Sequence, residues 1–123
     1  MAFTAAGNGG ASLLRSAIGL VLLFAITPVH AADSRCYGTP ANGRIEHAVR
    51  LPSAGRNFRA YSNLGVSLGR THVHARVAEV VTGAYAALAT SSPEKTFVYG
   101  ETGFAKGGPF KPHKTHQNGL SVD

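Results

Sequence analysis

Two histidines and an aspartate near the end of the sequence could hold a metal ion. His113 and His116 lie three residues apart, and Asp123 follows His116 by seven residues across an Asn-Gly pair that predicts a turn. Imidazole nitrogens and carboxylate oxygens are ordinary zinc donors, and a catalytic zinc has three protein ligands and an open position for water. The residue types and their spacing therefore predict a metal-dependent hydrolase that uses zinc.

The other histidines of the region after residue 31 are weaker metal candidates. His47 stands alone beside Glu46, and we expect an ordinary solvated or core histidine there. His72 and His74 form a His-x-His pair, which could chelate a metal on a strand. We expect them at the start of a helix, where side chains at positions i and i+2 point apart. No metal role is therefore assigned to this pair.

One helix and one strand are predicted upstream of the histidines. Apolar residues recur at helical spacing, which predicts a helix over residues 72–90 with Thr71 as its N-cap. The β-branched and aromatic run at residues 96–100 predicts a strand. Residues 33–70 are rich in glycine, proline, asparagine and arginine, which predicts loops with brief strands.

The segment that carries the histidines is predicted to be a loop. Glycines and prolines fill residues 101–115, and residues 120–122 are predicted to begin another strand. This order of elements indicates the α+β class, with one main helix packed on a small, mostly antiparallel sheet and with an active-site loop.

The first third of the chain has the pattern of a secretory signal peptide. A single charged residue, Arg15, precedes an apolar run of about ten residues, and small residues at the end of residues 1–31 mark a cleavage site. The run is short for a membrane span, which needs about 20 residues. An uncleaved membrane anchor is the alternative. We therefore expect a signal peptide over residues 1–31, a single domain over residues 32–123, and no stable membrane span after cleavage.

The chain is basic, with 12 Lys and Arg against 6 Asp and Glu and a net charge of +6. A basic exported protein suits an anionic partner such as a cell-wall polymer, although the charge could serve solubility alone. The basic residues are scattered rather than gathered in the dense run typical of a nucleic-acid-binding arm, so no nucleic-acid partner is expected.

Cys36 is the single cysteine of the sequence. Exported proteins usually pair their cysteines, so Cys36 has either a partner elsewhere or a free thiol. We assign it no catalytic role, and its pairing stays open.

A family resemblance covers residues 36–123. It is carried by a glycine-rich loop and by the closing segment, which reads His113-Lys114-Thr115-His116-Gln117-Asn118-Gly119-Leu120-Ser121-Val122-Asp123. This arrangement resembles the active-site segment of penicillin-insensitive murein endopeptidases, a family within the zinc peptidases that include D-Ala-D-Ala carboxypeptidases and lysostaphin-type enzymes. The resemblance implies a partial zinc-peptidase domain that acts on peptidoglycan in the periplasm.

The resemblance also implies roles for single residues. His116 and Asp123 would be zinc ligands, and His113 would be a further active-site histidine close to the metal or the substrate. The bond cleaved would be the D-alanyl–diaminopimelyl cross-link of peptidoglycan, attacked by zinc-activated water.

Four loop residues are candidates for substrate binding. Lys111 and Lys114 could meet the carboxylates of stem peptides, or they could be solvated loop lysines. Gly107 and Gly108 could shape a substrate groove, or they could be ordinary loop glycines. Glu101 is acidic and near the loop, but nothing in the sequence fixes its distance to a metal.

The sequence departs from the family pattern at its end. The family takes its remaining zinc histidine from a downstream His-x-His segment, whereas this sequence ends at Asp123. We therefore expect a truncated copy that is inactive as written. The alternatives are an inactive peptidoglycan-binding remnant and a small exported metal-binding protein, and the sequence does not reveal the oligomeric state.

Overall fold

A computed structural model describes residues 33–123, which form an α+β fold as the sequence predicts. The predicted signal peptide lies outside the described residues. None of the helices within residues 33–123 has the length and apolar character needed to cross a bilayer. The strands form three two-stranded sheets rather than one continuous sheet, two of them antiparallel and one parallel.

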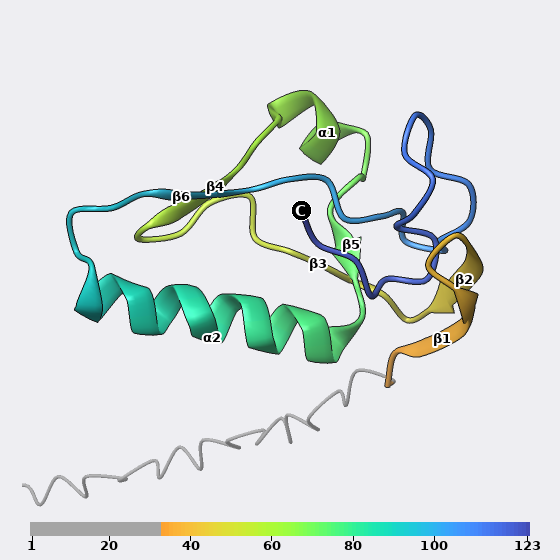
Figure 1. Cartoon of the computed structure of the whole chain (residues 1–123), viewed down its shortest axis with the longest axis horizontal. Coiled ribbons are helices and arrows are strands. Elements are labelled where there is room, and N and C mark those ends of the chain that lie inside the picture. The colour runs from red at the N-terminus through yellow and green to blue at the C-terminus, as the bar shows by residue number, and fades with distance from the viewer. Residues whose placement is uncertain (1–32) are drawn as a thin grey trace, which may run out of the picture.

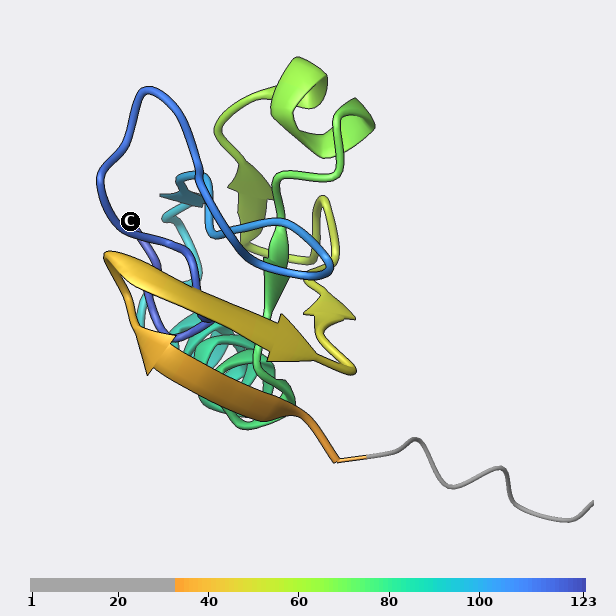
Figure 2. The same ribbon diagram turned by 90° about the vertical axis from the view of Figure 1, so that its right-hand side faces the viewer.

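The fold begins with a hairpin of β1 (Arg35–Thr39) and β2 (Asn42–Glu46), paired antiparallel. The hairpin lies at one end of the molecule, in front of α2 when the structure is viewed along that helix (Figure 2). Its turn and second strand hold the later chain, because Gln117 N donates to Pro40 O at 2.9 Å and Gly108 N donates to Gly43 O at 3.1 Å. The hairpin therefore supports the loop that carries the histidines.

Two short strand pairs form the centre of the fold. β3 (Val49–Arg50) pairs antiparallel with β5 (His72–Val73), and β4 (Phe58–Ala60) pairs parallel with β6 (Phe97–Tyr99). β6 lies inside the strand predicted at residues 96–100, which confirms that prediction.

A short helix that we did not predict, α1 (Asn63–Ser67), connects β4 to β5. The Ser62 hydroxyl caps it by accepting a hydrogen bond from Gly65 N at 3.0 Å.

The main helix, α2 (Ala75–Ser91), runs along one side of the strands (Figure 1). It begins three residues later than predicted, and its N-cap is His74 rather than Thr71, since His74 Nδ1 accepts from Arg76 N at 3.0 Å. Thr71 is buried and forms a bridge to Gly103 instead. The prediction that His72 belongs to the helix is wrong as well, because β3 offers it a strand partner.

The core lies between α2 and the strands. Leu51, Ala60, Val73 and Tyr99 form its buried centre. Residues of α2 and the penultimate Val122 pack against this cluster. The Tyr99 hydroxyl donates to Pro52 O at 2.8 Å, which satisfies a buried polar group at little cost.

The loop predicted over residues 101–115 is present, but the strand predicted at residues 120–122 is not. Residues 120–122 join no sheet ladder, and the end of the chain is instead fixed through Asp123, whose backbone oxygen accepts from Gly100 N at 2.6 Å.

Candidate metal centre

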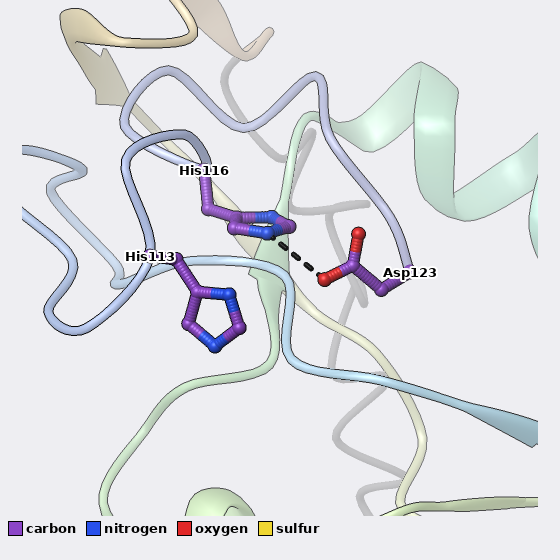
Figure 3. Close-up of side chains that lie close together, drawn as sticks. All are labelled: His113, His116 and Asp123. Carbon is purple, nitrogen blue, oxygen red and sulfur yellow. Dashed lines mark ion pairs between the residues drawn. The ribbon is translucent and has the colours of Figure 1, made fainter.

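The structure brings His113, His116 and Asp123 together, as the sequence predicts. One ligand atom from each residue lies within 4.8 Å of the others. Figure 3 shows the two imidazoles and the carboxylate facing a common space, with His116 between its neighbours. Of these three residues, only His116 is buried.

His116 is the most constrained member of the cluster. Its side chain is 2% exposed, and its backbone has a φ of 71°, a left-handed conformation that residues other than glycine rarely adopt. Its carbonyl oxygen lies so close to Gly103 that a Cβ added there would approach it to 2.8 Å. Strained backbone of this kind clusters at functional sites, where the surrounding structure maintains it.

The two ring nitrogens of His116 have different surroundings. Nε2 lies 3.1 Å from Asp123 Oδ2, whereas the buried Nδ1 has no hydrogen-bond partner among the described residues. Buried polar atoms usually have partners, so the unpartnered nitrogen sets this histidine apart from an ordinary core residue.

Asp123 reaches the cluster because its backbone is fixed at two points. Gly100, just after β6, donates its amide hydrogen to the Asp123 backbone oxygen at 2.6 Å, and the preceding Val122 packs on the core. The carboxylate itself is 57% exposed, which leaves one side of the cluster open to solvent.

His113 lies on the loop and packs against aromatic neighbours. Its ring centroid is 5.7 Å from that of buried Phe110 and 5.2 Å from that of His116, with the two imidazole planes at 88°. Its Nε2 lies 3.4 Å from Glu101 Oε2, within ion-pair distance.

Arg70 is an addition to the site that the sequence did not reveal, and its pairing with Glu101 gives that acidic residue a place beside His113. Arg70 donates from Nε and from one terminal nitrogen to the two Glu101 oxygens, at 2.7 and 2.6 Å. These hydrogen bonds hold the pKa of the Glu101 carboxyl below its ordinary value. The two residues are 31 positions apart, so no local pattern could have paired them.

The four candidate substrate residues occupy the loop in two different ways. Lys111 and Lys114 are exposed. Gly107 and Gly108 have φ values of 69° and 83°, and a Cβ on Gly107 would lie 2.0 Å from Gln117 O. Gly107 therefore permits close packing of the loop against the chain after His116, whatever it contributes to a groove.

The remaining candidates are engaged elsewhere. His72 Nδ1 lies 2.8 Å from Gly69 O, and the His74 ring caps α2. His47 follows the last residue of β2, at the end of that strand away from the hairpin turn. It is exposed and has a φ of 53°. Cys36 is a free thiol among the described residues, and burial raises its pKa. None of these residues joins the cluster.

His116 and Asp123 fit a zinc ion in both chemistry and spacing. Imidazole nitrogen and carboxylate oxygen are normal zinc donors, and tetrahedral coordination with bonds of about 2.0–2.1 Å places two ligand atoms about 3.4 Å apart. The 3.1 Å between His116 Nε2 and Asp123 Oδ2 is close to that separation. The exposed side of Asp123 leaves space for substrate beside these two residues.

The fold and this cluster define an α+β domain with a candidate metal centre beside a glycine-rich loop. The chain belongs to the penicillin-insensitive murein endopeptidase family, whose model matches residues 36–123. A comparison with curated proteins finds no match. Membership confirms the resemblance seen in the sequence and assigns the chain to metal-dependent peptidases that act on peptidoglycan.

Proposed function

We propose that residues 32–123 are the N-terminal portion of a zinc-dependent murein endopeptidase domain, in which His116 and Asp123 bind zinc and His113 is a further active-site histidine. The bond cleaved is the D-alanyl–diaminopimelyl cross-link of peptidoglycan, and the enzyme works in the periplasm after removal of residues 1–31. The observation that supports this proposal is the convergence of His113, His116 and Asp123 within 4.8 Å.

Each residue of the site has its own role in the proposed reaction. His116 and Asp123 bind the ion, and the buried surroundings of His116 keep its ring in one orientation. When bound, zinc supplies a Lewis acid for the amide carbonyl and lowers the pKa of water toward about 7. His113 is more exposed than His116, and it can hold or move a proton beside the scissile amide. Lys111 and Lys114 attract the carboxylates of stem peptides.

A second candidate function, metal binding without hydrolysis, is favoured by the number of ligands. The described residues supply two first-choice ligands, whereas a catalytic zinc has three. By the family resemblance, the third is an imidazole from a downstream His-x-His segment. We therefore expect the 123-residue chain on its own to bind zinc weakly and to cleave no muropeptide.

The test compares two proteins. The encoding DNA is sequenced past the codon for Asp123, and any longer in-frame product is purified beside the 123-residue chain. Both are incubated with cross-linked muropeptides, with and without a zinc chelator, and the products are separated by chromatography. The proposal expects chelator-sensitive cleavage from a product that contains a His-x-His segment and none from the shorter chain. Cleavage that survives chelation would contradict the zinc mechanism, and chelator-sensitive cleavage by the 123-residue chain would contradict the need for a third ligand.

A further inference from the structure

One short segment contacts all three residues of the metal centre. Gly100 donates a hydrogen bond to the backbone of Asp123, Glu101 lies at ion-pair distance from His113, and Gly103 lies against the backbone of His116. The two glycines allow these close contacts because they have no side chain. Glu101 is the member of this segment that reaches a ring nitrogen of the site.

We propose that Glu101, clamped by Arg70, is a positioning residue that keeps hydrogen on His113 Nε2 and thereby presents the Nδ1 lone pair to the metal centre. The proposal rests on the proposed function, because it concerns the histidine assigned there to proton handling.

The Glu101 carboxylate is held in place rather than free in solvent. Its side chain is 21% exposed and that of Arg70 is 13% exposed, and the two form a pair of parallel hydrogen bonds. Such two-point arginine–carboxylate pairs fix orientation as well as distance. A single-point contact from a lysine would not do so.

Arg70 is itself fixed by further contacts. Its guanidinium lies 4.0 Å from the ring centroid of Phe110 and donates to Lys111 O at 3.0 Å. Phe110 is 1% exposed and also packs on His113 and His116. The clamp and the two imidazoles therefore share one buried aromatic ring, which links the position of the carboxylate to that of His113.

The contact with His113 selects one tautomer. An ionised carboxylate accepts hydrogen bonds and donates none, so Glu101 Oε2, 3.4 Å from His113 Nε2, favours the form with hydrogen on Nε2. The partner of one ring nitrogen decides which nitrogen carries the lone pair. Figure 3 shows that the other ring nitrogen of His113, Nδ1, faces His116 and Asp123.

This arrangement gives the site an acceptor at a defined atom. With Nε2 occupied, His113 offers Nδ1 as the atom that takes a proton or a hydrogen bond beside His116 and Asp123. A carboxylate that accepts a hydrogen bond from one ring nitrogen is a common way to orient a histidine at a metal site.

The test reads the tautomer directly. The 123-residue chain is labelled with ¹⁵N and studied without metal at a pH where its histidines are neutral, and long-range ¹H–¹⁵N spectra assign both nitrogens of His113. The proposal expects hydrogen on Nε2 in the unsubstituted protein. In Glu101→Gln it expects a mixture of tautomers or an inverted one. Glu79→Gln is the matched control, because it removes a carboxylate from an exposed arginine pair on α2, and we expect it to leave His113 unchanged.

Three outcomes decide the question. Hydrogen on Nδ1 in the unsubstituted protein overturns the proposal whether or not any variant folds. An unchanged His113 spectrum in a folded Glu101→Gln variant also overturns it and leaves Glu101 as a purely structural partner of Arg70. A loss of the single tautomer confined to Glu101→Gln supports it. Because neither zinc nor substrate is present, a failure of the proposed function would leave this result standing.

Discussion

The backbone amide of Gly100 lies 2.6 Å from the backbone oxygen of Asp123, and no side chain could fit between the two residues. A Cβ on Gly100 would approach Asp123 Cβ to 2.8 Å and its backbone oxygen to 3.3 Å. Asp123, the proposed carboxylate ligand, therefore packs against the residue that follows β6. The distance between Asp123 and His116 depends on that contact.

Substitution Gly100→Ala is expected to lower zinc affinity by about tenfold or more, because the added methyl group displaces Asp123 from His116. Zinc titration calorimetry measures the change. Gly83→Ala is the control, since Gly83 lies in α2 with no atom within 4 Å of an added Cβ. It should raise stability by about 0.5–1 kcal/mol and leave zinc affinity unchanged. Equal zinc affinities in both variants would refute the role of Gly100.

Zinc should stabilise the folded chain through His116 and Asp123. A ligand present at about 100 times its dissociation constant adds about 2.7 kcal/mol of stability. Asp123→Asn removes a charged donor and should abolish most of the shift in melting temperature, whereas the exposed Asp33→Asn should keep it. The measurement is thermal unfolding followed by circular dichroism across a zinc series. A full zinc shift in Asp123→Asn would exclude Asp123 as a ligand.

Substitution Arg70→Lys should destabilise the fold by about 1–2 kcal/mol. Lysine keeps the charge but loses the parallel hydrogen bonds to Glu101 and the stacking on Phe110. Arg76→Lys is the matched control, because its pair with Glu79 is exposed and contributes little. Urea unfolding gives both values, and similar losses in the two variants would show that the clamp adds no more than a surface ion pair.

The Arg70–Glu101 pair should also make stability depend on pH. The fold lowers the Glu101 pKa from 4.5, chiefly through hydrogen bonds from Arg70. The ionised form therefore favours the folded state, and its contribution is complete above about pH 4.5 and is lost as the pH falls through the folded value. The stability difference between the unsubstituted chain and Glu101→Gln should shrink below pH 4.5. Urea midpoints at pH 7, 4.5 and 3 test this, and a constant difference would contradict it.

Local patterns in the sequence predicted the main elements of the fold but not their partners. The apolar repeat that predicted a helix over residues 72–90 corresponds to α2, yet β3 pairs with His72 and Val73 and delays the helix start. No helical periodicity could show that competition, because it depends on residues more than 20 positions earlier. The missed helix α1 spans only five residues and contains Gly65, so it lacked a periodic signal.

In the candidate site, too, the sequence predicted the clustered residues but not their long-range partners. His113, His116 and Asp123 lie within eleven residues, and their spacing indicated a shared role that the structure makes possible. Glu101 drew attention only as an acidic residue near the loop, because its significance depends on Arg70 and on the ring of Phe110. Contacts that cross 31 or more positions need the folded chain to become visible.

The contacts between the first hairpin of the domain and the metal centre indicate when the metal centre forms during folding. Gln117, next to His116, reaches back to that hairpin through a contact with Gly43 that spans 74 positions, and its amide donates to Pro40 O. Closing such long loops is slow, so contacts of this range form after local helices and turns. A chain that has formed only α2 carries its metal ligands on an open loop, and His116 acquires its fixed geometry when that loop meets the hairpin. Metal binding at His116 and Asp123 should therefore report the completion of folding, not its beginning.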